Sequence, residues 1–377
     1  MKRLAPDFKT IADFRKDNAT GIKKACQAFI QFCRQANLLT GRLVAIDGSK
    51  FRAAASKDRA LTRKQLREQR KRVDRLVELY LSQLDRADGD DVTVAMESNR
   101  VRQALSRLKA EAVELDEAEE AMDASGGNQH CRTEPDAKLM RSGREGMVLG
   151  YNVQTAVDAD SGLIVHHDVN DQGSDNRQLQ PMAEESKVAL QADKITVVAD
   201  AGYSNGEQQA ACEAQGIDVA VPSNRAVNNR PGQPFPKEAF RYDAKRDCFT
   251  CPAGEELTYT TYSSKDKMRL YSRSGCGVCA LQSQCTRADR RWVSRHFHED
   301  AFAVSEGRLA ANPGLMRERM TVAERPFAVL KQLMGLRRLA CWGMEGAKAE
   351  IGIAVLSYNL ARMINEVGVN RLLIALR

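Results

Sequence analysis

The chain has 377 residues, which suits two or three domains, and its 43% hydrophobic and 28% charged residues are typical of a globular protein. The net charge of +7 permits a nucleic-acid partner but does not by itself indicate one. The chain has no apolar run near the roughly 20 residues that span a membrane, and no signal-peptide core follows its N-terminus, so we expect a cytoplasmic protein without a membrane partner.

The first forty residues are expected to be helical, because apolar side chains recur at helical spacing from Phe8 and Ile11 onward. Cys26 and Cys33 fall among them, and we interpret both as small core residues rather than metal ligands. The chain holds ten cysteines. In a cytosolic protein this number indicates thiols or metal ligands rather than disulfides.

A short apolar strand begins at Leu43 and ends in Asp47, and a Gly-Ser turn follows it. Two long amphipathic segments come next, separated by a polar turn region, and this pattern predicts an antiparallel helical hairpin. The first helix of the hairpin is strongly basic, which indicates either a solvated face or a surface that contacts phosphate. The candidates for phosphate contact are Arg63, Lys64, Arg67 and Arg70.

The middle of the chain alternates between strand and helix patterns. A strand at 150–158, a turn and a returning strand at 163–169 predict a β-hairpin. The pattern then continues with a helix at 177–190, a strand that ends at Asp200, a helix near 205–215 and a strand at 217–222. This succession predicts a mixed α/β sheet.

Asp47 and Asp200 share one feature, since each ends a short apolar strand. Open α/β sheets place their chemistry at strand ends, so the two carboxylates could lie side by side. A pair of carboxylates binds hard divalent cations such as Mg²⁺, which prefer oxygen ligands. The alternative is that each aspartate only caps a turn.

Residues 223–300 change in character and carry five cysteines among many polar turns. Cys248-x₂-Cys251 and Cys276-x₂-Cys279 have the paired spacing of a tetrahedral zinc site, and Cys285 adds a fifth candidate ligand. The ligand set stays open, because His296 and His298 could also take part. Reduced free cysteines are the alternative.

Residues 315–337 suit a helix that either begins or kinks at Pro326. Glu324 lies next to this point and Lys331 lies two turns further on. A surface glutamate that caps a helix is the plain interpretation of Glu324. The expected inward-facing residues of this helix are Val322, Phe327, Leu330, Leu333 and Met334. In a last helix at 345–377 they are Ile351, Ile353, Val355, Leu356 and Leu360.

Together these motifs resemble the catalytic signature of bacterial insertion-sequence transposases, which are DDE enzymes with an RNase H-like core. The matching motifs are Asp47 in Ile-Asp-Gly-Ser-Lys, Asp200 in Val-Ala-Asp-Ala-Gly-Tyr, and Glu324 in Arg-x₄-Glu-x-Pro-Phe-x₃-Lys. Tyr151-Asn152-x-Gln154 and the Cys-Pro-x-Gly beginning at Cys251 are similar to one branch of this group. The resemblance extends over nearly the whole chain.

The resemblance implies an RNase H-like mixed sheet with flanking helices, interrupted by a helical-hairpin insertion and a Cys-rich insertion. The expected domains are a helical N-terminal remnant at 1–42, a hairpin at 57–130, a zinc-binding insertion at 223–310, and a catalytic core formed by 43–56, 131–222 and 311–377. Related transposases begin with a further helical domain that helps to bind transposon ends. We therefore expect this chain to be truncated at its N-terminus, which leaves its activity open.

The resemblance also implies a chemistry for these residues. Asp47, Asp200 and Glu324 would hold two Mg²⁺ or Mn²⁺ ions about 3.5–4 Å apart, for phosphodiester hydrolysis and strand transfer at transposon ends. Arg319 and Lys331 would contact phosphate near the scissile bond. The family pattern favours Cys251, Cys276, Cys279 and Cys285 as zinc ligands, with Cys248 as the alternative.

The implied partners are double-stranded DNA, as transposon terminal inverted repeats and as target, and a second copy of the chain when DNA is bound. The protein would then associate with the nucleoid. Two other functions fit the same residues. One is an RNase H-like nuclease without strand transfer, and the other is a catalytically dead, truncated regulator that binds the ends of a related transposon.

Overall fold

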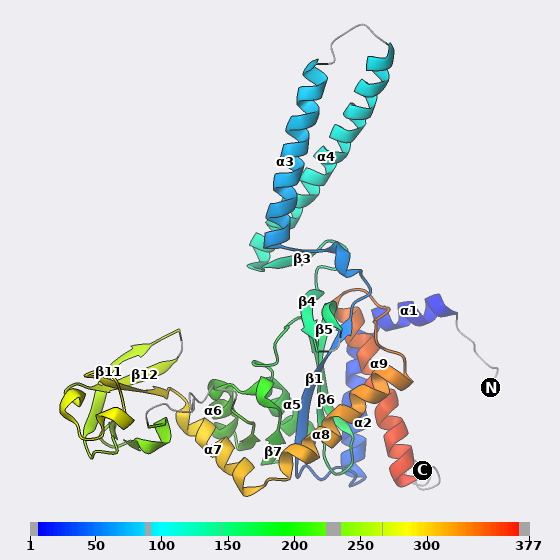
Figure 1. Cartoon of the computed structure of the whole chain (residues 1–377). Coiled ribbons are helices and arrows are strands. Elements are labelled where there is room, and N and C mark those ends of the chain that lie inside the picture. Colours follow the sequence, from blue (N-terminus) through cyan, green and yellow to red (C-terminus); the bar gives the residue numbers. More distant parts are fainter. Residues whose placement is uncertain (1–6, 87–91, 144, 224–234, 266, 369–377) are drawn as a thin grey trace. The chain divides into compact units, whose positions relative to one another are not determined.

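The structure is a computed structural model that describes residues 7–86, 92–143, 145–223, 235–265 and 267–368 (Figure 1). The chain divides into two compact units, and each is assembled from separate stretches of sequence. Unit 1 comprises Met1–Thr40, Asp47–Asp175 and Thr321–Arg377, and unit 2 comprises Gly41–Ile46 and Asn176–Met320.

The main sheet has the strand order β4-β5-β1-β7-β8, and β6 also pairs with β5. Strand β1 (Val44–Arg52) contributes its first residues to unit 2 and the rest to unit 1. In unit 1, β5 (Gly146–Asp158) pairs antiparallel with β4 (Lys138–Ser142) and β6 (Ile164–Asn170). In unit 2, β7 (Ile195–Val198) runs parallel to β1 and to β8 (Ile217–Ala220). The expected mixed sheet with flanking helices is confirmed.

Burial explains why these segments form central strands. Val44, Ala45 and Ile46 are completely buried, and so are Val197 and Val198 in the neighbouring strand. Continuous β-branched and apolar runs of this kind suit strands that are covered on both faces.

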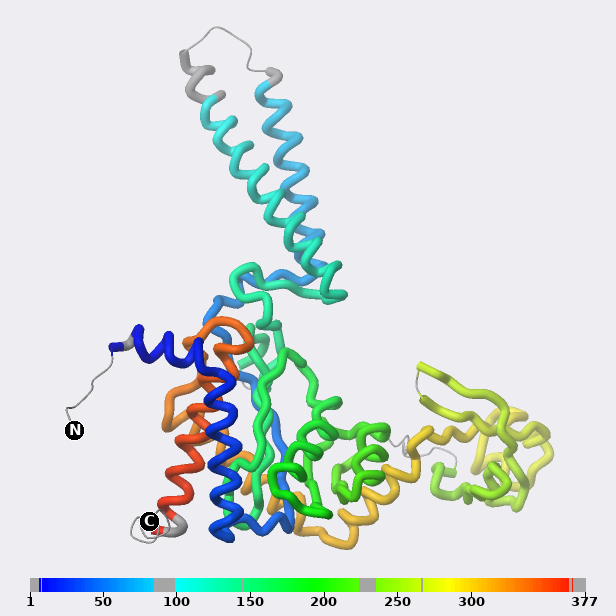
Figure 2. Tube along the Cα trace, turned by 180° about the vertical axis from the view of Figure 1, so that it is seen from behind, coloured from blue at the N-terminus to red at the C-terminus, as the bar shows by residue number. Residues whose placement is uncertain are grey.

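The helices of unit 1 that come from the two ends of the chain lie side by side. These are α1 (Phe8–Asp17), α2 (Ala19–Gln35) and α9 (Gly343–Val367), and both views show α2 along α9 (Figures 1 and 2). Cys26 packs with Ile22 against Ala349 of α9. Burial raises the pKa of Cys26 to about 11 and that of Cys33 to about 12. The prediction that both are core residues is therefore confirmed.

Helix α8 (Leu315–Ala328) continues through Pro326 and passes into a π-helical turn, Val329–Leu333. The wider π turn changes the direction of the side chains that follow it. Leu330 is buried as predicted, but Leu333 is 81% exposed, so the prediction that Leu333 faces inward is wrong. Leu360 of α9 is 44% exposed and is also not a core residue.

Unit 2 carries helices of its own, the first residues of α8 and a second sheet. The helices are α5 (Leu179–Leu190), α6 (Gly206–Ala214) and α7 (Glu299–Ala311). The second sheet is antiparallel in the order β13-β12-β11-β10-β9. Its strands are β9 (Arg241–Asp243), β10 (Cys248–Thr250), β11 (Glu256–Ser263), β12 (Met268–Arg273) and β13 (Arg291–His296). The sequence predicted a Cys-rich insertion here but not this sheet.

The helical hairpin predicted after the first strand is present. Helices α3 (Arg63–Arg86) and α4 (Val92–Ser125) pack along each other (Figure 1), and β2 (Ala60–Thr62) pairs with β3 (Gln129–Cys131) at their base. Their shared core consists of Leu66, Val73, Leu108, Leu115, Ala118 and Met122. Short 3₁₀ turns occur at Lys57–Arg59, Ala201–Tyr203, Lys237–Ala239, Cys276–Val278 and Gln282–Gln284. Among the described residues, no helix is long and apolar enough to span a membrane.

Candidate active site

Asp200 follows strand β7 and caps the 3₁₀ turn Ala201–Tyr203. Its Oδ1 accepts a hydrogen bond of 2.8 Å from the Gly202 amide, and its Oδ2 lies 3.4 Å from the guanidinium group of Arg319. Arg319 is itself buried and also donates to the Ile46 carbonyl oxygen of β1 at 3.4 Å. This arginine therefore holds the strand-end carboxylate, and its predicted contact with phosphate stays a prediction.

Asp47 lies within β1 and is half-buried. Its Oδ1 accepts a hydrogen bond of 2.9 Å from the Gly48 amide. In the parallel ladder between β1 and β7, Val44 pairs with Val197 and Ala45 with Val198. Asp47 lies two residues after Ala45, and Asp200 lies two residues after Val198, the partner of Ala45. Strand β1 continues to Arg52, so the prediction that it ends at Asp47 in a Gly-Ser turn is wrong, whereas Asp200 does follow the end of β7 as predicted.

Glu324 lies on α8 directly after the buried Ala323, and its side chain is exposed. Because this carboxylate is exposed, it can bind a ligand without any change in the helix. Among the residues that the structure describes, however, no group of three or more His, Cys, Asp or Glu side chains is placed to hold a metal ion. The predicted convergence of Asp47, Asp200 and Glu324 thus stays a prediction.

Lys331 lies in the π-helical turn and directs its ammonium group at β1. The Nζ atom donates to Ser49 Oγ and to the Lys50 carbonyl oxygen, both at 2.7 Å, and lies 4.6 Å from the centre of the Phe51 ring. Burial lowers the pKa of this amine below its usual value. Lys331 therefore fixes the stretch of β1 that follows Asp47, whereas its predicted phosphate contact has no counterpart among these bonds.

A polar network beside β1 was not predicted as a site. Asp175 accepts hydrogen bonds from Asn152 Nδ2 and Gln154 Nε2, both at 2.7 Å. It also forms an ion pair of 3.1 Å with Lys50 Nζ. Asn152 and Gln154 are completely buried on β5. The signal in the sequence was the Asn-x-Gln spacing, which places two amides on one face of an otherwise apolar strand. Buried amides need partners, and Asp175 supplies one.

The tyrosine of the same motif has a different partner. Tyr151 donates a hydrogen bond of 2.7 Å to Glu134, which is 1% exposed. Glu134 also accepts from the backbone amides of Ala55 at 2.8 Å and Gly343 at 3.2 Å. This buried carboxylate joins three separate segments of unit 1, so the role of Tyr151 is structural.

The basic helix of the hairpin is partly neutralised by its neighbour. Arg63 pairs with Asp123 of α4 at 2.7 Å, and Arg70 pairs with Asp116 of the same helix. Lys64 is far more exposed, and its carboxylate neighbour lies 3.9 Å away on the same helix. Arg67 is exposed as well. Of the four predicted phosphate contacts, Lys64 and Arg67 are therefore the two that face solvent most openly.

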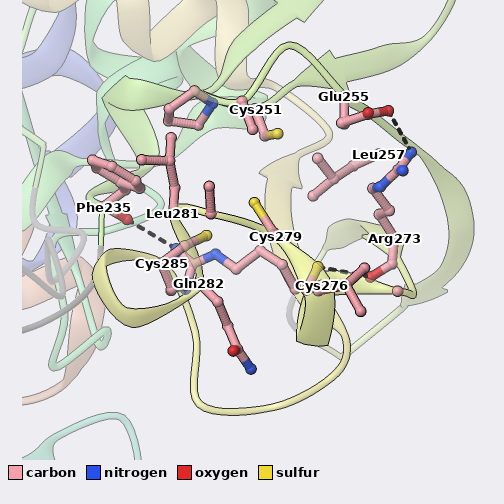
Figure 3. Close-up of a pocket in the computed structure, with 16 residues that line it drawn as sticks. Phe235, Cys251, Glu255, Leu257, Arg273, Cys276, Cys279, Leu281, Gln282 and Cys285 are labelled. Atoms are coloured by element: carbon pink, nitrogen blue, oxygen red, sulfur yellow. Dashed lines mark hydrogen bonds and ion pairs between the residues drawn. The ribbon is translucent and has the colours of Figure 1, made fainter.

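Four cysteines of unit 2 line one pocket of about 300 Å³ (Figure 3). They are the four that the family pattern favours: Cys251, Cys276, Cys279 and Cys285. The turn that carries Cys276 is held by Asp289, which accepts hydrogen bonds from the amides of Gly275 and Gly277. Burial raises the pKa of Cys285, and the other three thiols act in the same direction. Among the described residues, however, these thiols do not form a group that could hold a metal ion.

The other zinc candidates lie elsewhere. Cys248 is buried on β10, where its Sγ lies 3.8 Å from a carboxylate oxygen of Glu256. His296 accepts a hydrogen bond from the His298 amide and packs edge-on against Phe302. Neither histidine lines the cysteine pocket, and the suggestion that they could replace a cysteine ligand finds no support.

Comparison with known proteins gives the family. A family model described as "Transposase DDE domain" matches residues 129–360, well over half of the chain. The chain belongs to the transposase DDE domain family. No match was found among curated proteins. The cryo-EM structure of the piggyBac transposase synaptic complex with hairpin DNA is similar at 9% identity and a TM-score of 0.24, over 60% of this chain and 44% of that chain.

The family match covers only part of the predicted site. Asp200 and Glu324 lie inside the matched residues of the DDE transposase domain, as do the four pocket cysteines. Asp47 and the whole of α3 precede them. Assignment of Asp47 therefore depends on its place in β1 beside β7, rather than on the family match.

Proposed function

We propose that this chain is the DNA transposase of an insertion sequence, which cleaves phosphodiester bonds at transposon ends and joins them to target DNA. The observation that carries the proposal is the register of β1 and β7. In a chain that belongs to the DDE transposase family, Asp47 and Asp200 each lie two residues after the last printed pair of this parallel ladder, Ala45 with Val198, which supports the proposal that they act together. Asp200 stands just beyond the end of its strand, where open α/β sheets place their chemistry.

The donor set fits the metal that this function requires. Asp47, Asp200 and Glu324 offer carboxylate oxygens, which are the ligands preferred by Mg²⁺ and Mn²⁺. When bound, such ions activate an attacking oxygen and stabilise a leaving oxygen. The other residues prepare the site. Arg319 balances the charge of Asp200 and orients it, while Lys331 fixes the backbone beyond Asp47.

Strand cleavage tests the proposal. The substrate is duplex DNA that carries the sequence flanking the coding region, incubated with the full chain and Mg²⁺ or Mn²⁺. Asp47→Asn, Asp200→Asn and Glu324→Gln should each reduce cleavage at least about 100-fold, as expected when a group that stabilises developing charge is removed. Glu185→Gln is the matched control, because Glu185 is an exposed carboxylate on α5, and it should cleave like the wild type.

The products separate this function from its two alternatives. A transposase converts the cleaved ends into molecules joined to target DNA, whereas a nuclease leaves cleaved ends only. A DNA-binding regulator cleaves nothing and binds DNA equally well with Asp200→Asn. Light scattering of the DNA complex would show whether two copies of the chain assemble, as we expect for a protein that joins two ends.

For the cysteine pocket we propose a structural zinc ion held by Cys251, Cys276, Cys279 and Cys285. Thiolates are preferred zinc ligands, and these four share one pocket, although they are not gathered closely enough to form a metal group among the described residues. Elemental analysis of protein purified without chelator should find one zinc per chain. Cys279→Ser should lose it and Cys248→Ser should retain it. Zinc that is absent, or lost equally from both variants, would contradict this ligand set.

A further inference from the structure

The second sheet of unit 2 exposes a group of aromatic and arginine side chains at one end. Tyr259, Tyr262, Arg269, Arg295 and Phe297 line an open pocket of about 380 Å³, which we call the aromatic platform. Tyr262 is 59% and Phe297 is 43% exposed. The buried core of the same sheet consists of Phe240, Phe249, Leu257, Tyr271 and Val293. The platform adjoins this core, because the ring centres of Tyr259 and Tyr271 lie 6.0 Å apart, yet Tyr262 and Phe297 remain in solvent.

The two arginines of the platform lie over aromatic rings. The guanidinium group of Arg269 lies 4.7 Å from the centre of the Tyr259 ring, and that of Arg295 lies 4.2 Å from the centre of the Tyr242 ring. Carboxylates hold both groups in place, since Arg269 pairs with Asp247 and Arg295 pairs with Asp300 at 2.5 Å. Arg295 is itself buried, so it supports the platform from beneath, whereas the partly exposed Arg269 belongs to the surface that a planar ligand could contact.

The strand arrangement explains why the platform is open. Strand β10 covers only the first residues of β11, up to the pair Cys248–Thr258. From Tyr259 onward β11 pairs with β12 alone, and its register shifts between Tyr259 and Thr261. This uncovered stretch carries Tyr259 and Tyr262. Edge strands are usually protected by charge or by a covering segment, so exposed rings at this edge indicate a ligand surface.

A second open hollow borders the first one at Tyr259. It is lined by Arg273, Arg290 and four hydroxyl side chains: Thr258, Thr260, Ser272 and Ser274. Glu256 also lines this hollow, and Arg273 pairs with Glu255 at 2.9 Å. Arg290 is exposed and stacks on Trp292, and no carboxylate partner for it occurs among the described residues. A guanidinium group surrounded by hydroxyl donors is suited to a phosphate oxygen.

We propose that the aromatic platform binds unpaired nucleotides of single-stranded DNA, with a base stacked on Tyr262 and the backbone phosphate of another nucleotide of the same strand at Arg290. Stacking on exposed rings and arginine faces, next to a cationic groove, is the physical basis of single-strand binding without sequence preference. Paired bases in a duplex are already stacked, so their faces are not available to Tyr262. The arginines favour a nucleic acid over an apolar protein partner. This proposal does not depend on the carboxylate chemistry proposed above.

Fluorescence anisotropy with a labelled oligothymidine strand tests the platform in the full chain. Tyr262→Leu keeps the apolar area but removes the aromatic face. It should weaken binding about tenfold, which corresponds to about 1.4 kcal/mol and lies within the range for one stacked base. Tyr262→Phe should bind like the wild type, which shows that a loss in Tyr262→Leu is not a folding defect. Phe14→Ala, at an exposed ring of α1, is a second control and should leave binding unchanged.

Two further results separate the proposal from its rivals. Photocrosslinking of a bromouracil strand should attach to peptides between residues 259 and 297, and Asp200→Asn should bind the strand as tightly as the wild type. Equal binding by Tyr262→Leu and wild type, or crosslinks confined to other parts of the chain, would overturn the proposal. So would sedimentation that shows a dimer of the free chain dissociated by Tyr262→Leu, because the platform would then be an interface between copies.

Discussion

At the scale of single residues, the cations near Asp47 and Asp200 already form bonds within the protein. Arg319 contacts Asp200 and the backbone of β1, and Lys331 bonds two successive residues of β1. Each side chain comes from the α8 segment, so this segment fixes β1 at two points. The family resemblance suggested that both cations contact phosphate. The sequence could not reveal their bonds to β1, because the bonded residues of β1 lie more than 250 positions away in the chain.

Replacement of Lys331 tests its structural role. Lys331→Met preserves most of the buried aliphatic chain but removes two hydrogen bonds from a charged donor. The free energy of unfolding should fall by about 1.5–3 kcal/mol, the range for a hydrogen bond to a charged group, as measured by urea denaturation. Lys348→Met, on the surface of α9, should change it by less than about 0.5 kcal/mol. Equal stability of the two variants would leave Lys331 free for phosphate.

At the scale of elements, the basic side chains of helix α3 fall into two groups: some pair with carboxylates of α4, and others face solvent. Carboxylates of α4 form ion pairs with Arg63 and Arg70 of α3, whereas the side chains of Lys64 and Arg67 are exposed to solvent. Surface pairs of this kind contribute little to stability, but they reduce the charge that the helix offers to DNA. The basic residues of α3 were evident from the sequence. The sequence could not show that acidic residues of α4 lie opposite Arg63 and Arg70.

Salt dependence of duplex binding tests this division. We expect nonspecific binding whose logarithmic slope against salt is about −0.9 for each phosphate contacted. The double variant Lys64→Ala/Arg67→Ala should therefore make the slope shallower by up to about 1.8. Arg70→Ala should leave the slope unchanged, because its guanidinium group already pairs with Asp116. A shallower slope in Arg70→Ala but not in the double variant would contradict this assignment.

The elements also show what the sequence could predict. Periodic apolar residues located α2, α9 and the hairpin, and the apolar runs before Asp47 and Asp200 located β1 and β7. The π-helical turn was not foreseen, since no local residue pattern announces it, and Leu333 was consequently misplaced. The second sheet was missed because its strands are short and separated by polar turns. Four of the five cysteines in that region share a pocket, and they are the four that the family pattern favoured.

At the scale of the whole molecule, each unit is assembled from stretches that are separated in the sequence. Strand β1 passes from unit 2 into unit 1 between Ile46 and Asp47, and α8 passes from unit 2 into unit 1 after Met320. Asp47 and Glu324 thus belong to unit 1 and Asp200 belongs to unit 2. The central claim is that these three carboxylates act on one pair of metal ions.

Metal-directed cleavage of the protein itself is the most direct test of this claim. Fe²⁺ can replace Mg²⁺ at carboxylate sites, and with ascorbate and peroxide it cuts the backbone next to the bound ion. One preparation of the full chain with DNA should be cut near Asp47, near Asp200 and near Glu324. Excess Mg²⁺ should suppress all three cuts together, and Asp200→Asn should lose all three. Cuts near only one of these residues, or cuts that Asp200→Asn retains, would contradict a shared metal site.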